Sequence, residues 1–289
     1  MLRFLLLFGC LPLSLMAQTL DVQGHRGCRG LQPENTLVAF RKAMELGVTT
    51  LELDVVISGD GQVVVSHDPW MNAEICGGGA GLSVPEGKTL NLYRMTYAQI
   101  AQYDCGSRGN LRFPDQALVP AAKPLLTDVL TLIEQEAKAL GRPPLRYNIE
   151  LKSQAATDGL YHPAPLEFCR RVHEALAPYG LADRLTIQSF DFRILQRWYE
   201  LYPETALAAL VTRPISTKRL QRKLGFTPAI YSPYFRSLNA RRVSQFQAEG
   251  IQVIPWTVNS VTDMERLRRW GVDGIITDYP DRLLTLVAK

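Results

Sequence analysis

The chain has 289 residues, of which 46% are hydrophobic and 21% are charged, and its formal net charge at pH 7 is +4. This composition is typical of a soluble globular protein, and it excludes a disordered chain, a fibre and a channel built of long apolar spans. The arginines lie singly or in pairs among apolar residues and no recognition motif for DNA or RNA accompanies them, so no nucleic-acid partner is expected.

The first 17 residues are predicted to be a secretory signal peptide. One early positive charge precedes an apolar run that is too short to span a membrane comfortably. Cleavage is expected after Ala17, although Leu15 is larger than the residue usually found at its position. The alternative, a lipoprotein modified at Cys10, would leave a very short apolar region. We therefore expect residues 18–289 to be periplasmic or secreted, with no stable membrane span after cleavage.

Apolar, β-rich runs alternate with helical patterns over most of the chain, which is typical of βαβ units and a parallel sheet. Eight such runs, each followed by a helical or partly helical segment, favour a (β/α)8 TIM barrel in one domain over an open doubly wound sheet. The predicted strands are residues 20–24, 50–57, 145–151, 185–188, 206–210, 229–231, 252–255 and 274–277.

Three helices have boundaries that can be predicted from the sequence, because polar capping residues precede an apolar repeat. One is expected over residues 37–46, after Asn35 and Thr36 and before a terminating Gly47. The other two are expected over residues 129–134, after Thr127 and Asp128, and over residues 264–270, after Ser260.

The alternation of strand and helix is interrupted between His67 and Lys123, where the chain is rich in Gly and Pro and too long for a βα loop. Long loops inside compact domains are usually functional or form a small lobe. We expect an insertion of about residues 69–122, between strand 2 and helix 2, that caps the barrel mouth. The glycine run at 77–81 lacks the Lys-Ser/Thr ending of a phosphate-binding loop, so a flexible lobe is expected there.

Export would permit disulfides, and four cysteines remain after the predicted cleavage. Cys76 and Cys105 both lie in the irregular insertion, where a bridge would close a loop that has little regular structure, so this pair is expected to be joined. Cys28 lies beside the candidate site, whose residues are described in the next paragraphs. It is expected to be a small residue that packs, with a reactive thiol as the alternative.

Three carboxylates are predicted to meet at the barrel mouth. Glu52 and Asp54 lie two apart in a strand, so their side chains leave the same face about 7 Å apart. The same rule places Asn148, Glu150 and Lys152 together on the next strand. Such a cluster would repel itself unless neutralised, and a hard divalent cation is the simplest remedy. Ordinary surface ion pairs are the alternative, but active sites of this fold are built at the strand ends, whereas the walls and bottom are apolar.

Two histidines are expected at the same mouth. His25 follows the first strand, and His67 follows a hairpin-like segment at 61–67. Imidazole titrates near neutral pH, so the two could serve as general base and general acid. His162 and His173 lack such neighbours and are expected to be surface residues.

Two histidines, an arginine and carboxylates on one face of a strand are the groups that metal-assisted cleavage of a phosphodiester needs. Arg26 and Lys152 are expected to face the same opening, where they would supply fixed positive charge to a phosphoryl group that becomes more negative. Alternatively, the two residues could merely balance the charge of the carboxylates, which is compatible with binding a phosphoryl group. Glu34 could orient Arg26, orient a substrate hydroxyl, or begin the first helix, and the sequence leaves these roles open.

A series of short motifs resembles the glycerophosphodiester phosphodiesterase family, of the secreted or periplasmic bacterial type, in joint order and spacing over nearly the whole mature chain. The motifs are Gly24-His-Arg-Gly27, Pro33-Glu-Asn-Thr36, Glu52-Leu-Asp-Val55, His67-Asp68, Asn148-Ile-Glu-Leu-Lys152, Gln188-Ser-Phe190, Pro255-Trp-Thr-Val-Asn259 and Asp273-Gly-Ile-Ile-Thr-Asp-Tyr-Pro280.

The resemblance implies a barrel with a capping insertion that hydrolyses glycerophosphodiesters to sn-glycerol 3-phosphate and an alcohol such as choline or ethanolamine. It implies that Glu52, Asp54 and Glu150 hold a Ca²⁺ or Mg²⁺ ion. It also implies that His25 and His67 are the acid and base. The assignment of the two histidines, and the choice of water or the substrate's 2-hydroxyl as nucleophile, stay open.

The resemblance further implies that Arg26 and Lys152 bind the substrate phosphate and that Phe190 and Trp256 line the glycerol or alcohol side. One alternative is a phospholipase C- or D-like phosphodiesterase that acts on lipids or lysolipids. A second is a glycerophosphodiester-binding protein without catalysis, which the complete set of histidines and carboxylates disfavours. The sequence does not predict the oligomeric state.

Overall fold

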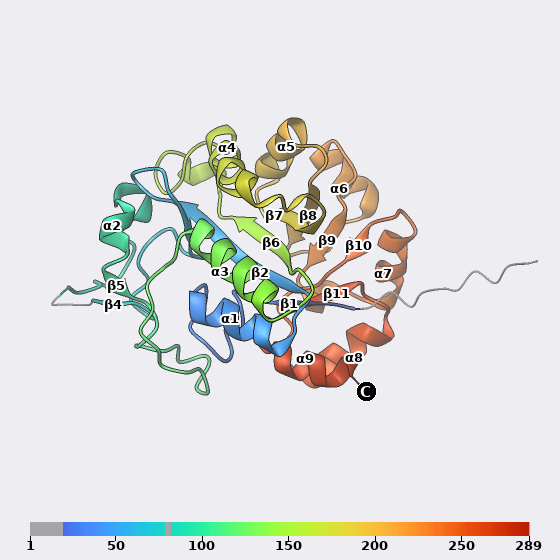
Figure 1. The fold of residues 1–289 in the computed structure, drawn as a ribbon. Helices are drawn as coiled ribbons and strands as arrows, with labels where there is room; N and C mark the ends of the chain where they lie inside the picture. Colours follow the sequence, from blue (N-terminus) through green and yellow to red (C-terminus); the bar gives the residue numbers. More distant parts are fainter. Residues whose placement is uncertain (1–19, 79–81, 289) are drawn as a thin grey trace, which may run out of the picture.

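Eight parallel strands form a (β/α)8 barrel in the computed structural model, which describes residues 20–78 and 82–288 (Figure 1). Their order around the sheet is β10-β9-β8-β7-β6-β2-β1-β11. All eight predicted strands are present, with ends shifted by two residues or fewer. They are β1 (Asp21–Gly24), β2 (Thr50–Ile57), β6 (Arg146–Leu151), β7 (Leu185–Ser189), β8 (Ala206–Val211), β9 (Ile230–Pro233), β10 (Gln252–Val253) and β11 (Gly274–Thr277).

The two ends of this strand order, β10 and β11, are joined by backbone hydrogen bonds that lie outside the regular strand pairing. Asp273 N donates to Val253 O, and Ile276 N donates to Pro255 O, both at 3.0 Å. Because all eight strands are parallel, their carboxyl ends meet at one mouth, which is where barrels of this type carry their active sites.

The helices pack around the strands (Figure 1), and their starts depend on local caps. Thr36 caps α1 by accepting a hydrogen bond from Ala39 N, as predicted, and Gly47 ends it at φ +97°. The predicted start of α3 is wrong by three residues, because Asp128 lies inside its first turn and accepts from Leu125 N. The α-helices are α1 (Leu37–Leu46), α2 (Tyr97–Ile100), α3 (Leu126–Ala139), α4 (Pro165–Leu176), α5 (Phe192–Leu201), α6 (Thr217–Leu224), α7 (Ala240–Gln247), α8 (Val261–Arg269) and α9 (Pro280–Val287).

Strand β2 connects the core to the site, because its alternate side chains point to opposite faces of the sheet. Leu51 and Leu53 belong to the apolar layer that also contains Phe40 of α1 and Val129 of α3. Glu52 and Asp54 alternate with these leucines along the strand, so their side chains point into the barrel, where they form part of the carboxylate cluster described below.

The barrel interior is apolar on one side only, contrary to the expectation of apolar walls. Ala208, Ile230, Ile254 and Ile276 form a small apolar cluster there. A buried amide network occupies the other side: Asn148 Nδ2 donates to Gln23 Oε1 at 2.8 Å, and Gln188 Nε2 donates to Glu52 Oε1 at 2.7 Å. This network supports the carboxylate cluster from below.

The insertion follows a short hairpin strand, β3 (Val63–Val65), which pairs antiparallel with β2. It contains α2 and a small sheet of β4 (Gly77–Gly78) and β5 (Tyr103–Asp104), and it lies at one side of the barrel in Figure 1. A disulfide joins Cys76 to Cys105. Gln116 ties the insertion to the loop after β1, because its Nε2 donates to Arg29 O at 2.6 Å.

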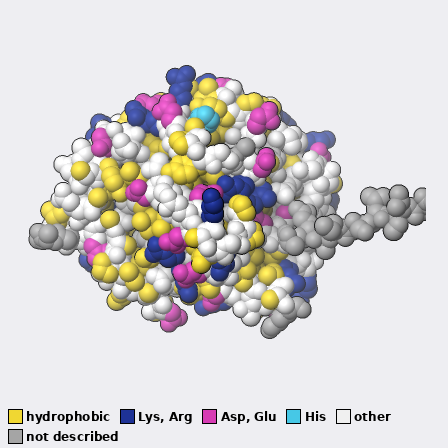
Figure 2. Space-filling view, viewed as in Figure 1, with side chains coloured by type: hydrophobic (Ala, Val, Ile, Leu, Met, Phe, Trp, Pro, Cys, Tyr) yellow, Lys and Arg dark blue, Asp and Glu magenta, His cyan; other side chains and the backbone are white. Residues whose placement is uncertain are grey.

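Several predictions fall on residues that the structure does not describe: the signal peptide, the alternative lipidation site Cys10 and the glycines from position 79 to 81. Within residues 20–78 and 82–288, none of the helices is both long and apolar enough to cross a membrane. On the face shown in Figure 2, lysines and arginines lie interspersed with acidic side chains.

Candidate active site

The three predicted carboxylates lie together inside the barrel mouth. Strands β2 and β6 pair in a register that sets Asp54 opposite Glu150 and Glu52 opposite Asn148. One oxygen from each of the three carboxylates lies within 4.8 Å of the others, and all three residues are buried. Like charges that face each other across two strands are unfavourable, so the cluster requires positive charge.

The negative charge of two of the three carboxylates, Glu52 and Glu150, is not fully balanced by nearby positive charge. Burial and the charge of Asp54 raise the pKa of Glu52 well above its ordinary value. Burial raises the pKa of Glu150 as well, although Lys152 opposes the shift. Burial would also raise the pKa of Asp54, but Arg26 and Lys152 outweigh it and the pKa is lowered. The three buried carboxylates offer only oxygen atoms and still lack enough positive charge nearby, so the cluster fits a hard divalent cation.

Arg26 reaches the cluster because the loop after β1 turns sharply. Arg26 and Gly27 have φ of +50° and +84°. A Cβ on Gly27 would lie 2.7 Å from the backbone of Ala39, so only glycine lets this loop approach α1. The turn directs Arg26 N toward Glu52 Oε2, to which it donates at 2.9 Å, while Arg26 Nε lies 3.3 Å from Asp54 Oδ2.

Lys152 follows β6 and completes the positive side of the cluster. Its Nζ donates to Glu150 Oε1 at 2.7 Å and lies 3.6 Å from Asp54 Oδ1. Burial would lower the pKa of Lys152, but Glu150 and Asp54 reverse this and raise it, so the ammonium stays charged.

Glu34 orients the arginines of this loop. Its Oε1 accepts from Arg26 Nη1 at 2.7 Å, and its Oε2 lies 3.5 Å from Arg29 Nη1. Of the three roles left open for Glu34, the structure supports the orientation of Arg26. The first helix is capped by Thr36, so Glu34 does not begin it.

His25 is held by Asp278, which directly follows β11. His25 Nδ1 lies 2.6 Å from Asp278 Oδ1, and Asp278 also accepts from Arg29 Nε and Asn259 Nδ2. Burial lowers the pKa of His25 to about 4, against the opposing effect of Asp278. His25 is therefore neutral at pH 7, with its proton on Nδ1 and a lone pair on Nε2, which lies 3.9 Å from Glu52 Oε2.

His67 has a similar partner but a more open position. Its side chain is 34% exposed, and its Nδ1 lies 2.8 Å from Asp68 Oδ1. Burial would raise the pKa of Asp68, but the hydrogen bond with His67 and that from Asn72 lower it to about 2. Asp68 is therefore ionised at neutral pH and orients His67 as Asp278 orients His25.

A cavity of about 210 Å³ brings the predicted residues together at the mouth. Within it, Phe190 and Trp256 pack edge to face, with ring centroids 5.3 Å apart. Asp54 and Glu34 contact its walls through their ion pairs with Arg26. The lining residues are His25, Arg26, Arg29, Glu52, His67, Arg112, Glu150, Lys152, Gln188, Phe190, Leu210, Trp256, Thr257 and Ile276.

Sequence reasoning missed the roles of Asp278, Arg29 and Gln188. A signal for Asp278 was available, since it stands directly after the last predicted strand, at the same end of the barrel as the carboxylates. Gln188 is likewise the fourth residue of β7, and its amide supports Glu52. Arg29 carries no such signal, because only the tight loop after β1 brings it to Asp278.

The prediction that His162 lies on the surface is wrong. The residue is 2% exposed, and its Nδ1 lies 2.9 Å from Pro163 O. Its Nε2 accepts from Gln154 N at 3.0 Å and lies 2.9 Å from Thr157 Oγ1. His162 therefore holds the loop after β6 in place. His173, also predicted to be a surface residue, is half-buried and stacks on Tyr202.

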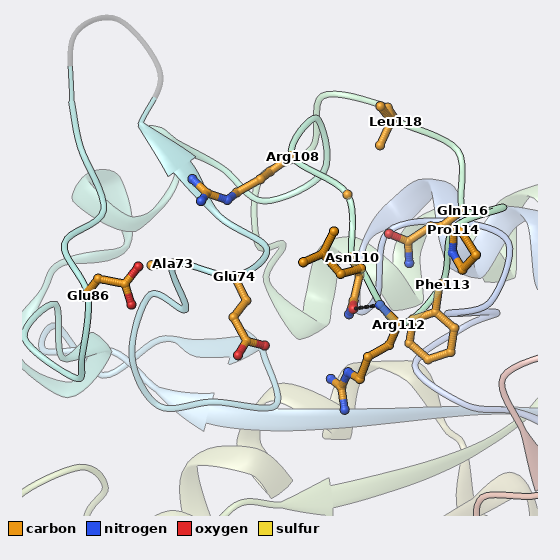
Figure 3. Close-up of a pocket in the computed structure, with 12 residues that line it drawn as sticks. Ala73, Glu74, Glu86, Arg108, Asn110, Arg112, Phe113, Pro114, Gln116 and Leu118 are labelled. Atoms are coloured by element: carbon orange, nitrogen blue, oxygen red, sulfur yellow. Dashed lines mark hydrogen bonds between the residues drawn. The ribbon is translucent and has the colours of Figure 1, made fainter.

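A separate cavity of about 630 Å³ lies in the insertion (Figure 3). Glu74 and Glu86 line it together with Arg108 and Arg112, and Asn110 Oδ1 accepts from Arg112 N at 3.0 Å. Arg112 lines both this cavity and that of the candidate site. The insertion therefore contributes a positive charge to the barrel mouth.

The fold and the site define a class: a (β/α)8-barrel hydrolase with a carboxylate cluster and two carboxylate-held histidines at its mouth. The model of the Glycerophosphoryl diester phosphodiesterase family matches residues 25–282. The chain belongs to this family of phosphoric diester hydrolases.

Known proteins of similar sequence and structure agree with this assignment. The chain is 30% identical over 268 residues to a glycerophosphodiester phosphodiesterase of Caldanaerobacter subterraneus subsp. tengcongensis, covering 93% of this chain and 98% of the other. A solved structure from Silicibacter pomeroyi DSS-3 has a TM-score of 0.84 at 30% identity and covers 94% of each chain. An Oleispira antarctica phosphodiesterase, solved with the product sn-glycerol-3-phosphate, has a TM-score of 0.75 at 25% identity and covers 93% of this chain and 97% of the other.

Proposed function

We propose that the protein hydrolyses glycerophosphodiesters to sn-glycerol 3-phosphate and an alcohol, in a reaction that requires a divalent cation and both histidines. The observation that carries the proposal is the single cavity lined by His25, His67, Glu52, Glu150 and the two phosphate-binding candidates. The Oleispira antarctica relative, solved with sn-glycerol-3-phosphate, supports the choice of substrate.

Glu52, Asp54 and Glu150 would hold the cation, which we propose to be Ca²⁺ or Mg²⁺ because all the donor atoms are carboxylate oxygens. When bound, such an ion neutralises the cluster and stabilises negative charge that develops on a phosphoryl oxygen. The raised pKa values of Glu52 and Glu150 support this reading, since they report negative charge that the chain alone leaves uncompensated.

His25 is suited to act as the general base. Asp278 fixes the proton on Nδ1, so the Nε2 lone pair is free to accept a proton from the attacking oxygen, whether that oxygen belongs to water or to the substrate's 2-hydroxyl. The buried position of His25 keeps the imidazole neutral before the reaction.

His67 is suited to act as the general acid. It lies at the more open side of the cavity, where a leaving alcohol has room to depart, and Asp68 orients the imidazole through Nδ1. Donation from Nε2 to the alcohol oxygen as the bond to phosphorus breaks would give a neutral alcohol.

Arg26 and Lys152 would bind the phosphoryl oxygens. Both line the cavity, and a carboxylate holds each in place: Glu34 accepts from Arg26, and Glu150, which also lines the cavity, accepts from Lys152. Fixed positive charge of this kind stabilises the additional negative charge of the transition state. Phe190 and Trp256 present apolar surface on the side expected to contact the glycerol carbons.

The test is release of sn-glycerol 3-phosphate from glycerophosphocholine by the mature protein, compared with its variants His25→Ala and His67→Ala. Loss of one acid or base is expected to lower kcat by about 100-fold or more while the fold is retained. His173→Ala is the matched control, because His173 lies outside the site. Near-normal turnover in both site variants would contradict the proposal, and faster cleavage of intact lipids or lysolipids would favour a phospholipase instead.

We also propose that the mature protein is periplasmic or secreted. The disulfide between Cys76 and Cys105 supports this, because structural disulfides persist mainly in oxidising compartments. Mass spectrometry of the protein from cell fractions would test it. A mature N-terminus near residue 18 in the exported fraction is expected, and an intact Met1 in the cytoplasmic fraction alone would contradict it.

A further inference from the structure

A second cavity, of about 400 Å³, adjoins the candidate site on the side of His67. It shares His67, Glu150, Lys152 and Phe190 with the inner cavity of about 210 Å³. A phosphodiester has two alcohol arms on one phosphorus. With the phosphate at the shared residues, one arm would therefore extend into each cavity.

The outer cavity has an aromatic wall built from two separate loops. Trp70, from the insertion, and Tyr161, from the loop after β6, pack edge to face with ring centroids 5.7 Å apart. Both line the cavity, and Phe190 lies at its boundary with the inner one. Ring faces of this kind carry partial negative charge and attract cations.

Hydrogen bonds hold this wall rigidly. The backbone on both sides of Trp70 is fixed, because Leu92 N donates to Pro69 O at 3.0 Å and Met71 N donates to Leu90 O at 2.9 Å. Asn91 Nδ2 donates to Leu160 O at 2.7 Å and so ties the insertion to the loop that carries Tyr161. The ring faces are therefore preorganised before a substrate arrives.

The chain itself places a cation on the Trp70 ring. Lys88 Nζ lies 4.2 Å from the ring centroid. Lys88 is exposed, and among residues 20–78 and 82–288 no carboxylate lies within ion-pair distance of its ammonium. The ammonium therefore rests on the ring alone, and an exposed lysine can move into solvent when another cation takes its place.

We propose that the outer cavity receives the leaving alcohol and that Trp70 selects alcohols bearing an ammonium group, which displaces Lys88 from the ring. This inference rests on the proposed function and specifies the second arm of its substrate. Lys88 then acts as an internal competitor that weakens binding of cationic alcohols, whereas Trp70 and Tyr161 strengthen it. His67, shared by both cavities, stands where the departing alcohol oxygen would need a proton.

The test compares kcat/KM for glycerophosphocholine with kcat/KM for glycerophosphoglycerol, which differ only in the charge and shape of the second arm. The ratio of the two is expected to fall about 3- to 30-fold in Trp70→Leu, the range of a cation–π contact, and to fall less in Trp70→Phe. It is expected to rise in Lys88→Gln but not in Lys218→Gln, a matched exposed lysine on α6. An unchanged ratio in Trp70→Leu, or a lower ratio in Lys88→Gln, would overturn the proposal.

A binding measurement separates this inference from the proposed function. Calorimetric titration of the mature protein with choline chloride, at constant ionic strength, needs no turnover. Binding by the wild type, tighter binding by Lys88→Gln and loss of binding in Trp70→Leu are expected. Choline binding without hydrolysis of any glycerophosphodiester would contradict the proposed function alone. Hydrolysis without choline binding to the wild type or to Lys88→Gln would contradict the cation subsite alone.

Discussion

His25 Nδ1 lies 2.6 Å from Asp278 Oδ1, although the two residues are 253 positions apart in the sequence. They follow the first and the last strands of the barrel, β1 and β11, which pair side by side in the sheet. The contact therefore exists only in the completed barrel. It fixes the tautomer of the proposed general base, so Asp278 acts as a positioning residue through His25.

Replacement of Asp278 by Asn is expected to lower kcat by about 100-fold or more, because an amide does not fix the proton of His25 on Nδ1. KM should change little, since Asp278 does not line the inner cavity. Steady-state kinetics on glycerophosphocholine would measure kcat and KM separately, with Asp183→Asn, a change at an exposed aspartate, as the control. A variant within a few-fold of wild-type kcat would show that Asp278 is merely structural.

Replacement of Glu52 by Gln is expected to stabilise the metal-free protein at neutral pH while abolishing metal-dependent turnover. Burial and Asp54 raise the pKa of Glu52, so its ionised form destabilises the fold. Removing that charge should raise the free energy of unfolding by about 1–3 kcal/mol. Chemical unfolding in the presence of a chelator would measure the difference from wild type.

The pH dependence of that difference has a defined sign. The folded pKa of Glu52 lies above the unfolded value, so the wild type regains stability as pH falls from neutral through the folded pKa. The advantage of Glu52→Gln should therefore shrink as pH falls toward 4.5. An advantage that grows on acidification would mean that Glu52 is adequately compensated by Arg26 and Gln188.

Cys28 is expected to be unreactive in the native protein. Its thiol is fully buried, lies 3.3 Å from Ala39 O, and has its pKa raised by burial to about 12, so the nucleophilic thiolate is absent at pH 8. Alkylation followed by peptide mass spectrometry should label Cys28 and Cys169 only after unfolding. Rapid labelling of Cys28 in the folded protein would restore the alternative of a reactive thiol.

Loss of the disulfide should destabilise the insertion before the barrel. The bridge spans 29 positions, and the chain-entropy model gives about 3–4 kcal/mol for a loop of that size. The double variant Cys76→Ser and Cys105→Ser should therefore be cut by proteases within residues 69–122 earlier than the wild type. Reduced wild type is the control and should match the variant, whereas equal resistance of reduced and oxidised wild type would contradict the prediction.

The sequence predicted the barrel because each strand is an uninterrupted β-rich run followed by a helical pattern. It also predicted that Glu52, Asp54 and Glu150 converge, since side chains two apart share a face of a strand and parallel strands end at one mouth. These inferences depend on local periodicity, which a single sequence carries.

Features that depend on tertiary contacts were not predicted. Arg29 reaches Asp278 only through the tight turn after β1, and His162 is buried only because the loop after β6 folds back on its imidazole. The amide network of Gln23, Asn148 and Gln188 joins β1, β6 and β7 across the barrel interior, although β2 separates β1 from β6 in the sheet. The sequence offers no periodic signal for such contacts.

The central claim is that a divalent cation held by Glu52, Asp54 and Glu150 is required for hydrolysis. The most direct measurement is a titration of the chelated mature protein with Ca²⁺ and, separately, Mg²⁺, in which bound ion and release of sn-glycerol 3-phosphate from glycerophosphocholine are followed together. We predict that activity rises in proportion to one bound ion per chain, and that Glu150→Gln shows weaker binding and lower activity at each concentration. Full activity of the wild type in excess chelator would contradict the account.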